Sequence, residues 1–347
     1  MPLYVDGHLD LASNVTVHGR DLTRGVLQQR RTEKREKQEL MVTLPELRRA
    51  RVGIVFGTLF TMPVDMVRRP GAPPLAEWQK EVCYETPDEA HDLAVEQLEI
   101  YEAWADDERV RILKTRRDLD AHVTAWEEGD RTPGLVLLME GADPIRTPDE
   151  LPWWWERGVR LIGPAWQRTR YAGGTSAPGP LTSMGKDLVR AMIERGVILD
   201  TSHLAEESFW DAMDLDPDRV CATHSNARAL VPGDRQLTDD MIRAIGDRDG
   251  IIGLILGDEM LVADPDADGP VTLADVQRHA EHVADLVGWD HVAIGSDFDG
   301  GFGRQETPQE LARGANFAAL GRIAPPDARD GLLGGNWLRF LRRTLPK

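Results

Sequence analysis

The sequence predicts a (β/α)8 barrel of the TIM type, and two features of the chain lead to this prediction. Short apolar runs alternate with amphipathic helical patterns along the whole length, an order typical of β/α units around a parallel sheet. The runs are continuously apolar, as expected for strands buried on both faces. A length of 347 residues suits one barrel, so we expect residues 1–347 to form a single domain.

Eight apolar runs are candidate strands, which is the number that this fold requires. They are, in chain order, Leu3–Asp10, Val52–Phe60, Gly134–Glu140, Val159–Pro164, Gly196–Ser202, Val220–His224, Gly250–Leu256 and His291–Asp297. Helical patterns lie between them. Gly185–Glu194 has apolar residues at helical spacing and stops at Gly196, and Thr272–Val287 begins with Thr272 as a candidate N-cap.

The chain departs from a minimal barrel in two places. A βα-loop insertion after the second strand contains several prolines at 63–76 and a candidate helix near Asp88–Trp104. After the eighth strand we expect two or three extra C-terminal helices, the last of them around 334–340.

The acidic balance of the chain excludes some classes of partner. There are 59 Asp and Glu residues against 41 Lys and Arg, a formal net charge of −18, so we expect neither nucleic-acid nor anionic-membrane binding. Two cysteines, Cys83 and Cys221, make no disulfide framework. With no apparent signal peptide or apolar span, we expect a cytoplasmic protein. A homodimer is one option that the sequence leaves open.

Residues that bind metals or transfer protons lie at the ends of five of the eight expected strands. They are His8, Asp10, Glu140, His203, His224 and Asp297. Catalytic groups of barrel enzymes lie at the C-terminal ends of strands, so we expect these side chains to converge. Three imidazoles with carboxylates suit zinc or a similar divalent ion, whereas burying so many ionisable groups without an ion is costly.

His8 and Asp10 are two residues apart, and side chains in a strand alternate with a period of two. Both should therefore point into the barrel and ligate one ion, while Leu9 points toward the helical layer. Asp6 should also point into the barrel, further from the end of the strand, and we expect it to support the ligand side chains.

Two ions account for the ligand set better than one. His8, Asp10, His203 and His224 are more protein ligands than a catalytic zinc with an open position usually takes. If these four residues form two pairs and Glu140 places one oxygen on each ion, each ion keeps an open coordination position. Two metals about 3.5–4 Å apart can share and acidify a water molecule. We therefore predict a site for two zinc ions.

Seven segments of the chain resemble the membrane (renal) dipeptidase family of zinc peptidases, peptidase family M19 of the amidohydrolase superfamily. They are DGHLD (6–10), MEGAD (139–143), PLTSMGKDLVRAMIERGVILDTSH (180–203), THSNARAL (223–230), DRQLTDDMI (234–242), IGSDFDG (294–300) and LGGNWLR (333–339). Each is modest alone, but together they are specific and extend over nearly the whole chain.

The resemblance implies a binuclear zinc dipeptidase that attacks a small dipeptide with a metal-bridging hydroxide. It implies that His8 and Asp10 bind one zinc, that His203 and His224 bind the other, and that Glu140 bridges them. It also implies that Asp297 passes the proton to the leaving amine. Arg235 would hold the free carboxylate of the substrate, a use that suits the planar guanidinium.

One segment departs from the family pattern. Members carry a histidine after the fourth strand that helps to polarise the scissile carbonyl, and Trp166 stands at that position here. Tryptophan cannot act as an acid or a metal ligand, although its N–H can donate. We expect Arg170 or Tyr171, which precede Gly173-Gly174, to face the metals in its place. The alternative is that Trp166 itself fills the volume and narrows the substrate pocket.

Two other functions stay open at this point. The altered Trp166 segment favours an amidohydrolase for another small substrate, such as an N-acyl amino acid, a lactone or an ester. The third hypothesis is a metal-binding scaffold without catalytic activity. The presence of Asp297 argues against a silent scaffold, because such a protein needs no proton carrier.

Overall fold

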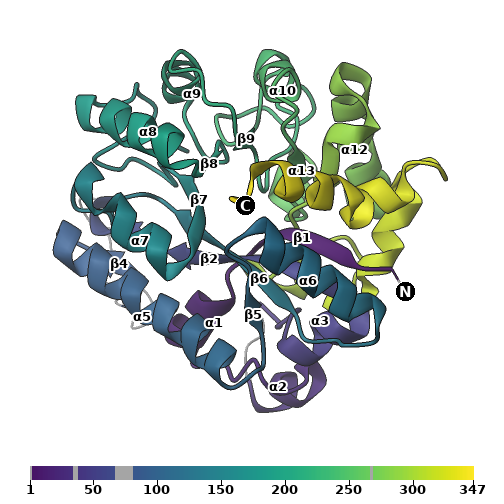
Figure 1. Ribbon diagram of the computed structural model, residues 1–347. Helices are drawn as coiled ribbons and strands as arrows, with labels where there is room; N and C mark the ends of the chain where they lie inside the picture. Colours follow the sequence, from purple (N-terminus) through teal and green to yellow (C-terminus); the bar gives the residue numbers. More distant parts are fainter. Residues whose placement is uncertain (1, 34–37, 67–80, 266–268) are drawn as a thin grey trace.

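A curled parallel sheet with helices around its outside forms the centre of the molecule (Figure 1). The computed structural model describes residues 2–33, 38–66, 81–265 and 269–347. The order in the main sheet is β1–β2–β6–β7–β8–β9, with β5 paired to β6, while β10 and β11 form a separate parallel pair. The strands of these two sheets are β1 (Tyr4–Leu9), β2 (Val52–Phe60), β5 (Arg111–Ile112), β6 (Gly134–Glu140), β7 (Val159–Gly163), β8 (Ile198–Asp200), β9 (Val220–Cys221), β10 (Ile252–Leu254) and β11 (Val292–Ile294).

Each of the eight expected runs contains one of these strands, but a closed eight-stranded barrel is not confirmed. Strands β2 and β6 have the expected ends, and the others are shorter. The chain comes together at both gaps between the two sheets: a parallel bridge joins Ala222 to Ile252, and the Asp297 amide donates to the His8 carbonyl at 3.2 Å. The architecture is therefore a mixed α/β fold with a curled parallel sheet.

Helices α8, α9, α10 and α12 follow one another round the outside of the sheet (Figure 1). The described helices are α1 (Leu11–His18), α2 (Val26–Thr32), α3 (Leu44–Ala50), α5 (Pro87–Asp106), α6 (Arg116–Glu127), α7 (Leu151–Arg157), α8 (Ser183–Arg195), α9 (Glu206–Met213), α10 (Asp239–Gly246), α12 (Leu273–Val287) and α13 (Asn336–Thr344). Among them, none combines the length and the apolar composition needed to cross a membrane.

Local signals account for the ends of the predicted helices. Thr272 caps α12 in a capping box with Asp275, as expected. Helix α8 begins after Thr182, whose hydroxyl accepts from the Gly185 amide at 3.0 Å, and it ends at Gly196, which has the left-handed φ of 78° that glycine adopts readily.

The insertion after β2 has the expected helix, α5, together with the short pair β3 (Met62–Pro63) and β4 (Cys83–Tyr84). Of the proline-containing loop at 63–76, residues 67–76 lie outside the described part of the chain. The extra C-terminal helices are also present: a 3-10 segment at Gly314–Ile323 and a π turn at Gly331–Gly335 precede α13.

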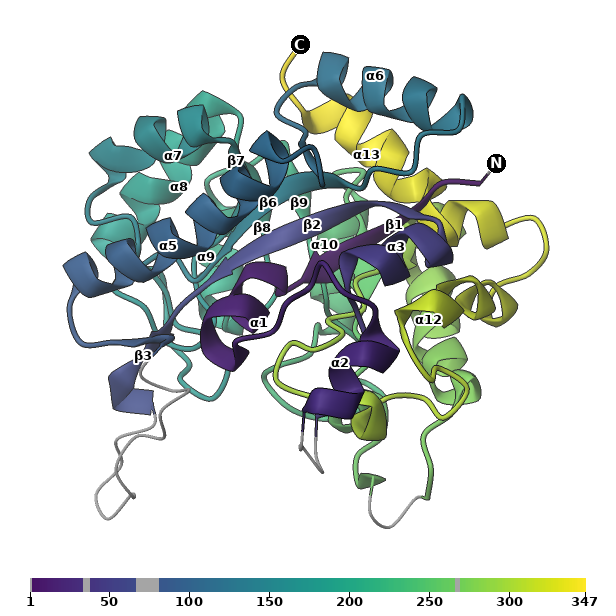
Figure 2. The same ribbon diagram turned by 90° about the horizontal axis from the view of Figure 1, so that it is seen from below.

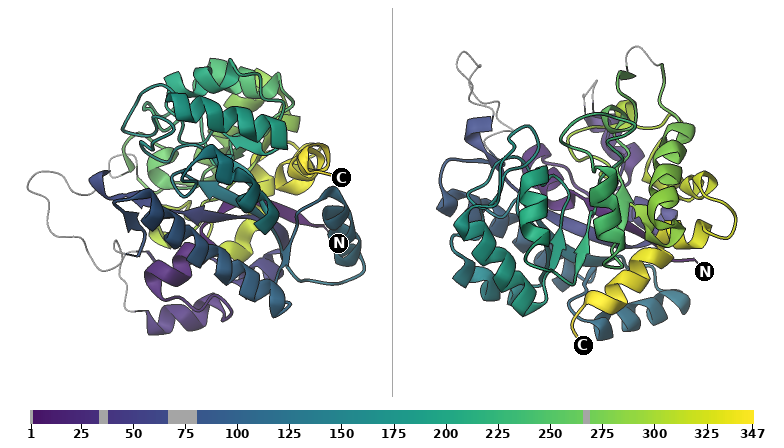
Figure 3. Two further views of the ribbon diagram at one scale, coloured as in Figure 1. Left: turned by 60° about the vertical axis from the view of Figure 1, so that its left-hand side comes forward. Right: turned by 90° about the horizontal axis from the view of Figure 1, so that it is seen from above.

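Helix α13 covers one end of the sheet, where it lies beside α6 and near both chain termini (Figures 2 and 3). Its Trp337 is fully buried, donates to the Ile294 carbonyl at 2.9 Å and meets the Phe56 ring edge-on. A Cβ at position 7 would lie 2.7 Å from the Trp337 ring, so only glycine lets that ring reach under β1.

The inner face of the sheet changes from apolar to polar along the strands. Leu138, Ile198 and Cys221 belong to the inner hydrophobic cluster that α13 seals. Two residues further on, and hence on the same face, stand the buried polar residues Glu140, Asp200 and Thr223. The apolar cluster therefore supports a polar layer at the C-terminal ends of the strands.

If packing of Trp337 stabilises the apolar layer, Trp337→Ala should lower the free energy of unfolding by ~3–5 kcal/mol, the usual loss for a buried aromatic side chain. Urea unfolding followed by circular dichroism measures this. Trp210 is 37% exposed on α9, so Trp210→Ala is the matched control and should cost less than ~1 kcal/mol. Equal losses in the two variants would contradict the role given to Trp337.

Candidate metal centre

The structure brings together all five residues that the sequence proposes as ligands. His8 lies in β1, Asp10 between β1 and α1, and Glu140 at the end of β6, while His203 and His224 follow β8 and β9. Each of the five is at most 8% exposed. The Glu140 carboxylate lies at the centre of the group. Its Oε1 is 3.2 Å from Nε2 of both His203 and His224, and its Oε2 is 3.5 Å from Nε2 of His8.

These side chains fall into two sets that share Glu140. His8, Asp10 and Glu140 have possible ligand atoms within 4.8 Å of one another, and so do Glu140, His203 and His224. This is the division expected from the sequence. Metal binding by the two sets stays a prediction, because the geometry defines only where the atoms lie.

Burial and mutual repulsion shift the pKa values of the carboxylates in this cluster. Burial raises the pKa of Asp297 well above its usual range, and burial with the Glu140 charge raises the pKa of Asp10 to about 6. Burial lowers the pKa of His8, but the nearby carboxylates, Glu140 first, outweigh it and raise that pKa to about 10. Buried carboxylates crowded in this way need cations to stay ionised.

The chemistry of the donor set therefore fits divalent cations. His8 Nε2 is buried and has no hydrogen-bond partner among the described residues, although it faces three carboxylates. Against the opposing effect of burial, the three imidazoles hold the pKa of Glu140 well below its ordinary value, so this carboxylate stays charged. Imidazole and carboxylate together suit zinc and similar ions.

Asp297 reaches the same group of residues from the loop after β11. Its Oδ1 lies 3.8 Å from His8 Nε2, and its backbone has a left-handed φ of 56°. His203 has a similar φ of 66°. Such conformations are unusual for residues other than glycine and are often found at functional sites. A Cβ at position 300 would lie 1.8 Å from Asp297 Oδ1, so Gly300 leaves the carboxylate its room.

A cavity of about 570 Å³ opens over these residues. Asp10, Glu140, His203 and Asp297 line its floor, and Arg235 and Trp166 line its walls. The Arg235 guanidinium donates to the His224 carbonyl at 2.7 Å and to Ser225 Oγ at 3.1 Å. Within the described part of the chain no carboxylate pairs with it, and its buried Nε has no partner. The cavity thus offers a fixed positive charge beside the carboxylate cluster.

Trp166 occupies the pocket wall, as in the alternative considered for this position. Its ring meets the Phe60 ring edge-on, with the centroids 5.1 Å apart, and lies 6.0 Å from the His203 ring. The side chain therefore lines the cavity next to one candidate ligand, and the narrowing of the pocket stays a prediction.

Arg170 and Tyr171 do not face the site, so the expectation that one of them replaces the family histidine is wrong. Arg170 Nε donates to Asp143 at 3.1 Å, and its other nitrogens donate to the backbone carbonyls of residues 143, 145 and 146. Tyr171 is fully buried and its hydroxyl donates to the Ile145 carbonyl. The acceptors after β6 draw both side chains away from the cavity.

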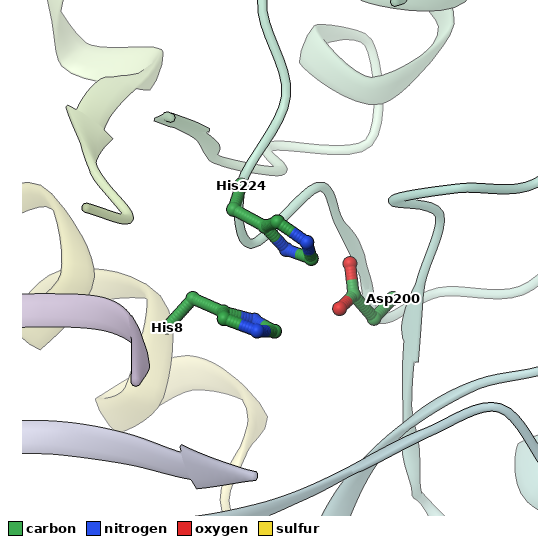
Figure 4. A group of neighbouring side chains, drawn as sticks. All are labelled: His8, Asp200 and His224. Carbon is green, nitrogen blue, oxygen red and sulfur yellow. The ribbon is translucent and has the colours of Figure 1, made fainter. Parts of the chain in front are cut away.

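Several residues that hold the candidate ligands were not assigned a role from the sequence. Thr58 donates to Asp10, Thr175 lies 3.0 Å from His203 Nδ1, and Asp200 lies beside His8 and His224 (Figure 4). Asp6, expected to support the site, accepts from the Ser296 amide at 2.7 Å and joins β1 to the chain after β11. The available signal for Asp200 was its place in the DTSH motif, three residues before His203.

Comparison with known proteins places these motifs in one family. The family description "Membrane dipeptidase (Peptidase family M19)" matches residues 2–344. A protein of Klebsiella pneumoniae, described as an uncharacterized protein in the pqqA 5' region, is 35% identical over 230 residues, which are 62% of this chain and 83% of that protein.

Two solved structures share the fold over almost the whole length. The metallopeptidase dipeptidase AC of family M19 is 25% identical, with a TM-score of 0.78, and the match covers 100% of this chain and 99% of that one. A metallopeptidase from Rhodobacter sphaeroides, liganded with a phosphinate mimic of L-Ala-D-Ala, is 24% identical with a TM-score of 0.78 over 99% of both chains. The protein therefore belongs to the membrane dipeptidase family, peptidase family M19, whose members are metallo-dipeptidases.

Proposed function

We propose that this chain is a metal-dependent dipeptidase that hydrolyses the amide bond of a small dipeptide with two bound zinc ions. The observation that carries the proposal is the place of Glu140, between two ligand sets and under the cavity that Arg235 lines. The family and its solved relatives support a dipeptidase over an enzyme for lactones or other esters.

His8 and Asp10 would hold one ion, His203 and His224 the other, with Glu140 shared. When bound, such a pair of ions supplies Lewis acidity and makes a water nucleophile available near neutral pH. The ions would also neutralise the crowded carboxylates that otherwise shift the pKa values of Asp10 and Asp297. We further propose that the two sheets form one closed barrel, because the chain meets at both gaps.

Arg235 orients the substrate by its free carboxylate. Its guanidinium is held by the His224 carbonyl and Ser225, and the residue lines the cavity. A planar guanidinium binds a carboxylate with two parallel hydrogen bonds, which fixes orientation as well as position. The amide bond of a dipeptide held in this way would lie over the floor of the cavity.

Asp297 moves the proton. Its carboxyl faces the cavity floor next to His8, and burial favours its protonated form by raising its pKa. A carboxyl at this place can take a proton from the attacking water and give it to the leaving nitrogen. Trp166 and Phe60 pack edge-on and form an aromatic part of the same cavity's lining.

Asp297→Asn removes the proton carrier and keeps the shape of the side chain. We expect kcat on a dipeptide to fall at least ~100-fold, the usual scale of acid–base catalysis, with the zinc content unchanged. Steady-state kinetics and elemental analysis of the same preparation measure both quantities. Undiminished kcat in a zinc-replete variant would show that another group carries the proton.

Arg235→Met removes the proposed carboxylate partner. For a dipeptide with a free C-terminus, kcat/KM should fall by ~30- to 1000-fold, which corresponds to ~2–4 kcal/mol for a charge-assisted pair that loses one partner. The matched control is Arg243→Met, since Arg243 lies on α10 and pairs with Asp240.

The same substitution tests the substrate class. A dipeptide amide lacks the carboxylate, so Arg235→Met should barely change its hydrolysis. If the unmodified protein cleaves the free and the amidated dipeptide equally well, the substrate orientation proposed for Arg235 is wrong.

A further inference from the structure

One buried hydroxyl lies behind the candidate ligands, on the side away from Glu140. Thr223 Oγ1 is 2.5 Å from Asp200 Oδ2, 2.9 Å from His224 Nδ1 and 3.4 Å from His8 Nδ1. The His8 and His224 rings lie one over the other with centroids 3.6 Å apart, and the Asp200 carboxylate faces them (Figure 4). All four residues are at most 2% exposed, so no bulk water competes for these contacts.

The direction of the hydrogen bonds follows from counting protons. A threonine hydroxyl has one proton to donate and two lone pairs to accept with. Asp200 Oδ1 already accepts from the amides of Thr223, at 2.9 Å, and Ser202, at 3.1 Å. The shortest contact, to Asp200 Oδ2, therefore takes the hydroxyl proton as a charge-assisted bond. One lone pair of Thr223 Oγ1 is then left to accept from His224 Nδ1 at 2.9 Å, and the other faces His8 Nδ1 and the Ser202 hydroxyl, both at 3.4 Å.

An imidazole that donates from Nδ1 keeps its lone pair on Nε2 when it is neutral. The Nε2 atoms of His224 and His8 are the ones that face Glu140, at 3.2 and 3.5 Å. We propose that Asp200 and Thr223 form a positioning pair that sets the tautomer of one ligand in each of the two cation sets. The inference rests on the proposed metal centre and adds a coupling between its two halves.

The same geometry argues against a third cation among His8, Asp200 and His224. Their possible ligand atoms do lie within 4.8 Å of one another. The Thr223 hydroxyl, however, is within hydrogen-bond distance of all three and occupies the place that an ion would need. Asp200 is thus a residue that acts through Thr223 rather than a ligand.

His203 provides an internal control, because its Nδ1 has a different partner. Thr175 Oγ1 lies 3.0 Å from it and, among the described residues, hydrogen-bonds to neither His8 nor His224. Loss of the Thr175 hydroxyl should therefore disturb one cation set, whereas loss of the Thr223 hydroxyl should disturb both.

The first test compares Thr223→Val, which keeps the side-chain shape, with Thr223→Ser, which keeps the hydroxyl. The two stepwise Zn²⁺ dissociation constants of the full chain are measured by competition with a chromophoric chelator. We expect Thr223→Val to weaken both by ~10- to 100-fold, the usual effect of removing a partner behind a metal ligand. Thr223→Ser should restore both, and Thr175→Val should weaken only one.

The second test reads the tautomer directly in zinc-free protein. In ¹⁵N-histidine-labelled chain, the His224 ring should give the Nδ1–H pattern in the unmodified protein and in Thr223→Ser. In Asp200→Asn the amide NH₂ would stand where Oδ2 was and donate to Thr223. The nearest remaining acceptor for the Thr223 proton is then His224 Nδ1, at 2.9 Å, so His224 should switch to the Nε2–H tautomer.

The outcomes separate this inference from the proposed function. If the unmodified chain binds no zinc, the metal centre itself is wrong. If it binds two ions, while Thr223→Val binds both with unchanged affinity or loses only one, the positioning pair is wrong. An unchanged His224 pattern in Asp200→Asn also overturns it. Circular dichroism of each zinc-free variant separates a lost fold from a lost tautomer, and Thr223→Ser decides the question if Thr223→Val does not fold.

Discussion

The buried Glu140 carboxylate is the constraint on which the rest of this structure depends. It faces the Nε2 atoms of three imidazoles that come from three different strands or strand ends, with Asp10 and Asp297 close by. Removing a carboxylate from water costs several kcal/mol unless opposite charge compensates it. Two divalent cations would compensate it here, and the contacts from Thr58, Thr175 and Thr223 then serve to aim ligands at them.

The fold makes this concentration of charge possible by separating two layers inside the sheet. Below lies an apolar layer sealed by Trp337, and above it, two residues further along the strands, lies the polar layer. Because side chains alternate along a strand, the same backbone that buries Leu138 and Ile198 must also present Glu140 and Asp200. The same strands therefore supply the apolar residues that stabilise the fold and, two residues further along, the polar residues of the candidate site.

The site was more predictable from the sequence than its surroundings. Strand ends and the period of two placed His8 beside Asp10 and brought Glu140, His203 and His224 to one edge, since these rules depend only on local geometry. The Thr223 contacts with Asp200 and His8 join residues far apart in sequence, and spacing alone does not reveal them.

The failures have identifiable physical causes. Arg170 turned away because Asp143, three residues after Glu140, competes for its guanidinium at 3.1 Å. Closure of the sheet was not confirmed because the ladder breaks on both sides of the pair β10–β11, and at one of these breaks the chain is joined by Asp6, which accepts from Ser296. Both contacts are tertiary, whereas the apolar pattern used for prediction is local.

The central claim is that Glu140 lies between two cations, and anomalous diffraction from zinc-grown crystals above the zinc edge tests it most directly. Two peaks that flank Glu140, one beside His8 and Asp10 and one beside His203 and His224, are the result that this account predicts. A single peak, a peak on the Asp200 carboxylate, or none at Glu140 would contradict it.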